Sequence, residues 1–178
     1  MRPRPCLLLF APGLLCAQDT QALFVGDWAH RIQAPKKWMK VGAEGDLPEL
    51  RFVPEGAPAN DLRVLSLRVL PPPEGSVKDQ ALQDLGAEAG GRVVQLEDRK
   101  GPKGLGQALV FQREVPAQGE GEEQEPGFVE WRAYVATRGG TACFGLRAKD
   151  EASLRALKGL LDDLIRSYAL IGDGPLPL

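Results

Sequence analysis

Short stretches in which apolar and polar residues alternate dominate this chain, and such alternation is typical of half-buried β-strands. They predict strands at residues 27–35, 50–53, 64–70, 92–100, 106–116, 128–137 and 141–148. Consecutive prolines directly after residue 70 end the third strand. The acidic segment at 117–127 has no apolar anchor, and it predicts a solvent-exposed hairpin tip.

Two segments have the apolar spacing of a helix instead. The first, at 76–91, begins with Ser76 and Asp79 at capping positions and ends at two glycines. Its expected buried face comprises Val77, Ala81, Leu82 and Leu85. The second, at 150–168, has Asp150 as its N-cap and a single apolar stripe along its length. Because successive strands joined by hairpins pair antiparallel, the sequence predicts an α+β fold with an antiparallel β-sheet flanked by helices.

The N-terminus has the pattern of an export signal. Arg2 and Arg4 precede a short apolar run that ends in small residues before a polar stretch. The run is too short to span a bilayer as a helix. Residues 1–17 are therefore interpreted as a signal peptide that is cleaved between Ala17 and Gln18.

Lipidation at Cys16 is the alternative interpretation of the same segment. A lipoprotein signal requires a small residue directly before the cysteine, and Leu15 fits that requirement badly. We therefore expect cleavage rather than a lipid anchor. The mature chain has no transmembrane span in this interpretation, and we expect it to be exported, either to the periplasm or as a secreted protein.

Charge and cysteine content narrow the functional classes. The chain of 178 residues has 22 Lys and Arg against 24 Asp and Glu, which gives no electrostatic reason to expect a nucleic-acid partner. Removal of the leader leaves Cys143 as the only thiol, so the mature domain has no internal disulfide. The length suits one domain with a hydrophobic core of its own.

The order of elements resembles that of the PsbP-like superfamily, which includes bacterial exported proteins of the DcrB kind. The resemblance rests on "HRIQAPKKW" at the start, "LRFVPEG" and "DLRVLSLRVLP", the helix that follows, "CFGLRA" and "IRSYAL" near the end. It covers about residues 28–171. It implies an α/β/α sandwich of the PsbP-like type, with a single such domain over 18–171. The residues themselves, "GDGPLPL" at 172–178, predict a flexible tail. It also implies a binding or assembly role without catalysis.

Four features that could carry chemistry are interpreted as structural. His30 is the only histidine, and the nearby Asp27 falls on the opposite strand face, so we expect a surface or packed histidine. Cys143 lies in an alternating strand and is expected to be a buried small side chain. The glycine-rich 101–106 segment precedes a strand rather than a helix, and the glutamates of 120–125 lack the spacing of a calcium loop. We therefore expect no catalytic residue, no metal and no cofactor.

One patch could form an interaction surface, because it combines an aromatic residue with basic ones. It comprises Trp38, Lys36, Lys37 and Lys40. In the alternative interpretation, Trp38 covers the end of the core and the lysines keep that end soluble.

The sequence therefore favours an exported non-catalytic domain that binds a protein partner or supports an envelope assembly. The alternative is an exported carrier of a small molecule or lipid, which would need a deep apolar pocket. An enzyme has the least support, since no nucleophile and base can be paired from the sequence.

Overall fold

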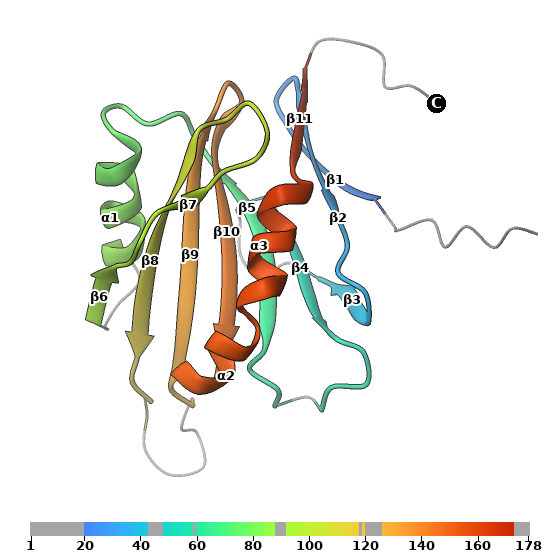
Figure 1. The fold of residues 1–178 in the computed structure, drawn as a ribbon, viewed down its shortest axis with the longest axis vertical. Coiled ribbons are helices and arrows are strands. Elements are labelled where there is room, and N and C mark those ends of the chain that lie inside the picture. The colour runs from blue at the N-terminus through green and yellow to red at the C-terminus, as the bar shows by residue number, and fades with distance from the viewer. Residues whose placement is uncertain are drawn as a thin grey trace, which may run out of the picture.

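The computed structural model describes residues 20–42, 48–58, 60–87, 92–117, 119 and 126–172 (Figure 1). The predicted signal peptide with its Ala17–Gln18 cleavage site and Cys16, and the glutamates of 120–125, lie outside the described residues. The elements are β1 (Thr20–Val25), β2 (Trp28–Gln33), β3 (Trp38–Val41), β4 (Glu49–Pro54), β5 (Val64–Leu70), α1 (Val77–Ala87), β6 (Arg92–Gln95), β7 (Arg99–Lys100), β8 (Gln107–Val115), β9 (Phe128–Thr137), β10 (Gly140–Ala148), α2 (Glu151–Ala156), α3 (Lys158–Ser167) and β11 (Ala169–Gly172).

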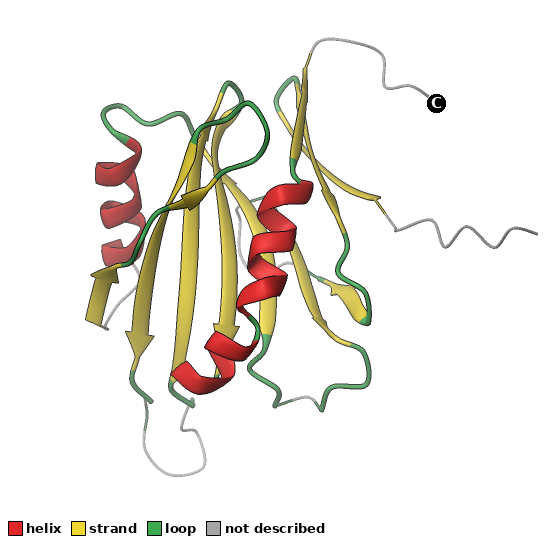
Figure 2. Cartoon of the chain, viewed as in Figure 1, coloured by secondary structure: helices red, strands yellow, loops and turns green. Residues whose placement is uncertain are grey.

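Antiparallel strands dominate the structure (Figure 2). The larger sheet has the strand order β3-β4-β5-β10-β9-β8-β6, with β7 also paired to β8. A smaller sheet has the order β1-β2-β11, so that the first and last described strands flank β2. The antiparallel sheet that the sequence predicts is thus confirmed.

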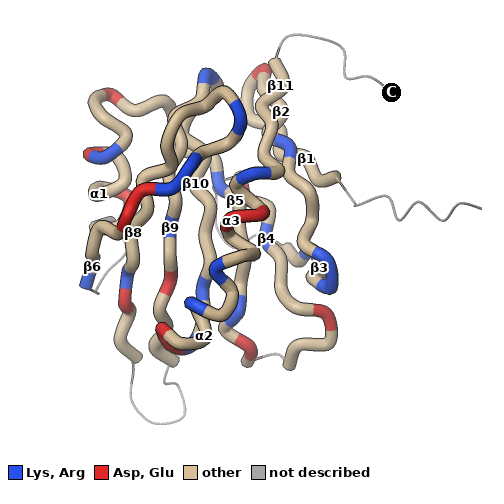
Figure 3. The backbone as a smooth tube through the Cα atoms, in the orientation of Figure 1, with Lys and Arg blue, Asp and Glu red and all other residues tan. Residues whose placement is uncertain are grey.

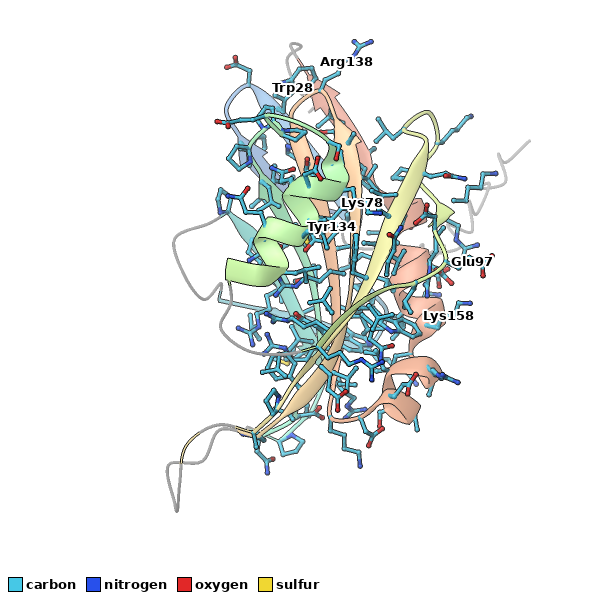
Figure 4. All side chains as sticks on the ribbon, turned by 90° about the vertical axis from the view of Figure 1, so that its left-hand side faces the viewer. Trp28, Lys78, Glu97, Tyr134, Arg138 and Lys158 are labelled. Atoms are coloured by element: carbon cyan, nitrogen blue, oxygen red, sulfur yellow. The ribbon has the colours of Figure 1, made fainter. Side chains whose placement is uncertain are left out.

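The larger sheet has two faces, because successive side chains of a strand point to opposite sides. We call the face that α2 and α3 cover the α3 face; it carries the main core, including Phe52, Phe144 and Leu161. The opposite α1 face carries a smaller apolar cluster under α1, which includes Tyr134 and Cys143. In Figure 4, α1 and the α2–α3 pair lie on different sides of the sheet, with Tyr134 close to α1.

Helix α1 covers only part of its face. Its buried apolar residues are Ala81 and Leu85, and these contact the small cluster around Tyr134. Charged side chains occupy the remainder of the α1 face. They lie near those ends of β9 and β10 that are farther from α1. The three-layer α/β/α sandwich therefore stays a prediction, whereas the combination of an antiparallel sheet with helices is shown.

Most predicted strands are present, but three strands were not predicted. β1, β3 and β11 are short, and two of them belong to the small sheet. The stretch at 92–100 forms two strands, β6 and β7, rather than one. The predicted tail at 172–178 begins too early, since Gly172 belongs to β11; residues 173–178 lie outside the described part.

The helix expected over 150–168 is two helices with a turn at Leu157. The Leu157 amide donates to the Leu154 carbonyl at 3.1 Å, which tightens the turn and redirects the chain. Leu154 before the turn and Leu161 after it are both buried on the sheet, so the bend lets both helices use the same core. Asp150 caps α2 as predicted, accepting a 2.7 Å hydrogen bond from the Ser153 amide.

The predicted start of α1 is present, but of its expected buried face Val77 is only partly buried and Leu82 is exposed. The Ser76 hydroxyl accepts from the Asp79 amide at 3.1 Å, which caps the helix. Leu82 is 45% exposed, because it follows Ala81 by one residue and so points about 100° away from it around the helix. In the described part of the chain, no helix is long and apolar enough to cross a membrane.

Candidate functional site

The residues of the predicted interaction surface do not share one environment. Trp38 is half-buried at the start of β3 and packs against the main core. Lys36, Lys37 and Lys40 are exposed. Trp38 therefore covers the end of the core, and a partner surface formed by these residues stays a prediction.

His30 is a packed histidine. It has no exposed surface, and its Nδ1 lies 2.8 Å from the hydroxyl of Tyr168, which follows α3. Burial lowers the pKa of His30, so the ring is neutral at neutral pH. Its observed partner is a phenol rather than a nucleophile or an orienting carboxylate, and this arrangement serves packing.

Cys143 is a buried residue of β10 on the α1 face. Burial raises the pKa of its thiol to about 11, so the thiolate that a nucleophile needs is scarce at neutral pH.

The glycine-rich 101–106 segment is a turn between β7 and β8, closed by a 3.0 Å hydrogen bond from the Gly101 amide to the Gly106 carbonyl. Among the described residues, no group of three or more His, Cys, Asp and Glu could hold a metal ion.

The structure brings together a set of arginines that the sequence interpretation missed. Their strands lie side by side, and strand register places their side chains on the α1 face in three rows. The middle row contains Arg51, Ser66, Gly145 and Arg132. The row nearer α1 contains Glu49, Arg68, Cys143 and Tyr134. The row farther from α1 contains Val64, Arg147, Glu130 and Arg113.

Two small residues lie at the centre of these rows. Ser66 and Gly145 are direct neighbours across β5 and β10, and they leave a hollow of about 180 Å³ in the α1 face. We call this hollow the arginine groove. Its lining comprises Glu49, Arg51, Val64, Ser66, Arg68, Glu130, Arg132, Cys143, Gly145, Leu146 and Arg147. Figure 3 shows basic segments within the strands of the sheet.

A carboxylate from α1 takes part in the hydrogen-bond network beside the groove. Asp84 accepts hydrogen bonds from Arg68 Nη2 at 2.8 Å and from Arg132 Nη1 at 3.1 Å. The Tyr134 hydroxyl donates to the same carboxylate at 2.7 Å. Asp84 therefore holds α1 on the sheet and orients two of the arginines that line the groove.

A second carboxylate lies at the other end. Glu130 Oε1 lies 2.6 Å from Arg113 Nη2 and 2.9 Å from Arg132 Nε. All three residues are buried, with Arg113 only 2% exposed. Because desolvation offsets much of the attraction within a buried ion pair, such a network contributes little to stability compared with apolar packing.

Arg147 closes the groove beside Glu130. Its guanidinium lies 4.1 Å from the centre of the Phe128 ring, in a cation–π contact. Burial lowers the pKa of Arg147, while the nearby Glu130 opposes that effect. Since arginine starts from a pKa far above neutrality, the side chain stays charged and the groove stays positive.

A larger hollow of about 850 Å³ lies between the 96–100 segment and the helices α2 and α3. Trp131 forms part of its floor, with Arg99 stacked 5.0 Å from the ring centre and paired to Asp162 at 2.5 Å. The lining is mainly charged, since Leu96 and Trp131 are accompanied by Glu97, Asp98, Arg99, Lys100, Arg155, Lys158, Asp162 and Arg166. This is not the deep apolar pocket that a lipid carrier needs.

A signal for the arginine groove was present in the sequence. Four strands contain an arginine between two apolar residues, in the segments "LRF", "LRV", "WRA" and "LRA" that contain Arg51, Arg68, Arg132 and Arg147. An arginine flanked in this way points to the opposite face from its apolar neighbours. Only the strand order, however, shows that these four arginines lie around one hollow.

Comparison with known proteins gives similarities to solved structures. No family model matches the chain, and no curated protein matches it. Among solved structures, the chain is similar to the solution structure of cyanobacterial PsbP (CyanoP) from Synechocystis sp. PCC 6803. The two are 16% identical with a TM-score of 0.48, over 92% of this chain and 99% of that chain. That protein is of the kind that the sequence resemblance indicates.

Proposed function

We propose that this chain is an exported, non-catalytic binding domain that takes an anionic group of a partner protein in the arginine groove. The observation that carries the proposal is the position of four arginines around one hollow. Arg51 and Arg132 flank Ser66 and Gly145 within a row, and Arg68 and Arg147 lie in the rows on either side.

The chemistry of arginine supports an anionic ligand. A guanidinium presents several N–H donors in a planar fork, which matches the two oxygens of a carboxylate. Electrostatic attraction is also stronger in a partly desolvated groove than on an open surface. A ligand with negative charge would therefore gain from several guanidinium groups at once.

Catalysis has no comparable support. The groove contains Cys143, but the raised pKa keeps its thiol protonated. His30 lies on β2, in the other sheet, and bonds to Tyr168. An arginine is too weak an acid to serve as an acid or base at neutral pH, so the groove is suited to hold a charge rather than to transfer a proton.

Export is the second part of the proposal, and it rests on the sequence of residues 1–17. Two arginines, a short apolar run and small residues before Gln18 form the pattern of a signal peptide. The periplasm or the extracellular space is the compartment in which such a domain would meet its partner.

Thermal unfolding in the presence of anions tests whether the groove binds them. The mature protein is heated in chloride and, at equal ionic strength, in sodium glutarate or sodium sulfate. A ligand that binds the folded state alone raises Tm in proportion to the logarithm of its concentration. We expect glutarate to raise Tm for the wild type.

The matched variants are Arg147→Gln, inside the groove, and Arg138→Gln, on the exposed turn between β9 and β10. Figure 4 shows Arg138 at one end of the molecule. The Tm increase should be lost in Arg147→Gln and kept in Arg138→Gln. Equal increases in both variants, or none in the wild type, would contradict the proposal.

A further inference from the structure

The larger hollow, between the 96–100 segment and the helices α2 and α3, has a fixed base. Arg99 of the segment pairs with Asp162 of α3 at 2.5 Å, and its guanidinium lies 5.0 Å from the centre of the Trp131 ring. Trp131 Nε1 donates to Gln112 Oε1 at 2.9 Å, which orients the ring. These contacts join the strand segment to the helix, so the two walls of the hollow have a defined position relative to each other.

Part of the base is apolar. Leu96 packs against the main core and lines the hollow together with Trp131. Val94 lies two residues before Leu96 on the same side of the chain, and it is 40% exposed. The register agrees with this placement, because Val94 pairs with Gln112 and Gln112 pairs with Trp131. An apolar side chain of a ligand could cover this strip.

The charged groups of the hollow fall into two sets. Arg155 and Arg166 pair with carboxylates of their own helices, and Arg99 pairs with Asp162. The other set has two carboxylates and two ammonium groups, and none of these has an ion-pair partner among the residues that the structure describes: Glu97, Asp98, Lys100 and Lys158. Equal numbers of both signs favour a ligand that carries both charges and has no net charge.

The carboxylate of Asp98 lacks a hydrogen-bond donor. Its Oδ1 is buried, and no described group donates to it. A buried acceptor without a donor is unfavourable, and such atoms are rare in folded proteins. Because Asp98 lines the hollow, an N–H group of a ligand could supply the missing hydrogen bond.

The two walls present their charges separately. Glu97 and Asp98 belong to the strand segment, whereas Lys158 begins α3 on the other wall. In Figure 4, Glu97 and Lys158 lie on the same side of the molecule. A peptide separates its two terminal charges along its length, as the walls separate theirs, whereas a free amino acid carries both charges on one carbon atom. The volume of about 850 Å³ is within the range of about 300–1,000 Å³ that small organic ligands occupy.

We infer that the larger hollow binds a short zwitterionic peptide. Its N-terminal ammonium donates to Asp98 and Glu97, its C-terminal carboxylate accepts from Lys158, and an apolar side chain lies over Leu96. Such charge-assisted hydrogen bonds are stronger than neutral ones. This site is separate from the arginine groove, because Leu96 and Trp131 belong to the α3 face of the sheet. The inference therefore does not rest on the proposed function.

Calorimetric titration of the mature protein with tripeptides tests the inference. The first peptide is Ala-Leu-Ala with both termini free. In the second the N-terminus is acetylated, in the third the C-terminus is amidated, and in the fourth both ends are blocked. Ala-Ser-Ala tests the apolar contact, and free leucine tests whether the charges must be separated.

We expect Ala-Leu-Ala with free termini to bind, and we expect each blocked end to weaken binding about tenfold, because each removes one charged contact. Ala-Ser-Ala and free leucine should bind more weakly than Ala-Leu-Ala. Raising the salt concentration should weaken the binding of Ala-Leu-Ala.

Two variants assign each end of the peptide to a wall. In Glu97→Gln with Asp98→Asn, acetylation of the N-terminus should no longer matter, whereas amidation of the C-terminus should still weaken binding. In Lys158→Gln the reverse should hold, since non-additive effects identify groups in direct contact. Glu74→Gln and Lys78→Gln are the matched controls, because both residues are exposed and lie in α1 or just before it. Both controls should bind the peptides as the wild type does.

Several results would overturn the inference. Equal binding of all four forms of Ala-Leu-Ala, or no binding of any, would refute a zwitterion site. Free leucine that binds as tightly as Ala-Leu-Ala would make the ligand a single amino acid. Loss of peptide binding in Arg147→Gln, with Lys158→Gln unaffected, would place the peptide in the arginine groove; the inference would then be wrong and the proposed function would stand.

Discussion

Gly145 lies directly across from Ser66 in the sheet, and a Cβ atom at position 145 would lie 2.6 Å from Ser66 Oγ. The centre of the arginine groove is open because neither residue has a large side chain. A methyl group here would occupy the space in which we place the ligand. The conformation of Gly145 does not itself require glycine, since its φ is not in the left-handed region.

Gly145→Ala should therefore reduce glutarate affinity about tenfold, with a change in unfolding free energy of no more than about 1 kcal/mol. The stability change is small because the Ser66 hydroxyl can rotate away from the new methyl group. Calorimetric titration and urea unfolding measure the two effects. Affinity equal to that of the wild type would mean that the ligand does not use the hollow.

Asp84→Asn should destabilise the fold. The substitution keeps the shape of the side chain but removes the charge that faces Arg68 and Arg132. Because Asp84 is partly buried, losing its charge-assisted hydrogen bonds should cost about 1.5–3 kcal/mol. Urea unfolding monitored by far-UV circular dichroism measures the loss. The control is Asp163→Asn, whose exposed pairing with Arg166 predicts a change below about 1 kcal/mol. Equal losses in the two variants would refute the role of Asp84.

The stability of the protein should fall as the pH drops below the ordinary pKa of histidine, 6.5. Burial lowers the pKa of His30 in the folded state, so the unfolded chain binds its proton first. Between the lowered folded value and 6.5, the unfolding free energy should decrease by up to about 1.4 kcal/mol per pH unit. Denaturant unfolding at several pH values measures this slope.

The same slope should be absent from His30→Gln in that pH range, since the chain has a single histidine. Glutarate affinity at neutral pH should be unchanged in this variant, because His30 lies in the other sheet from the groove. A variant that keeps the slope would assign it to other groups.

Trp38→Ala should lower the unfolding free energy by about 2 kcal/mol, because the half-buried ring packs against the core. Replacing Lys36, Lys37 and Lys40 together by glutamine should change it by less than about 1 kcal/mol, since all three are exposed. Chemical unfolding separates the two effects. If the lysine variant instead loses partner binding as strongly as Arg147→Gln, the predicted surface around Trp38 is part of the binding site.

Expression of the full chain in a cell that exports it should yield a mature protein that begins at Gln18. Intact-mass measurement distinguishes this product from one with a lipid on Cys16, which would be heavier and would partition into detergent. Arg2→Glu together with Arg4→Glu should slow processing, because signal peptides require a positive start. Unprocessed protein in the wild type would contradict the signal-peptide interpretation.

The sequence predicts the regular elements better than their ends. β5 and β9 have the predicted bounds because both combine clear alternation with a definite stop, such as the prolines after Leu70. β11 was missed because it has only four residues, and β1 because its segment "TQALFV" does not alternate; both take their places through pairing with β2. Such pairing brings together residues that are distant in the chain, and local pattern contains no sign of it.

The arginine groove was not predicted for the same reason. Each of Arg51, Arg68 and Arg132 is an ordinary polar position in a strand when it is read locally. Strand order places them around Ser66 and Gly145, and this order is a property of the whole sheet. Cys143 is buried, as the sequence predicts, and His30 takes the packed one of the two environments, surface or packed, that the sequence left open.

The small sheet makes folding depend on the end of the chain. β2 pairs on one side with β1 and on the other with β11, and the hydrogen bond between His30 and Tyr168 joins positions 138 residues apart. The N-terminal strands therefore cannot complete their sheet until the last strand has been synthesised. Contacts between such distant residues slow folding. In the export that we propose, this delay would keep the leading segment unpaired until the trailing segment has crossed the membrane.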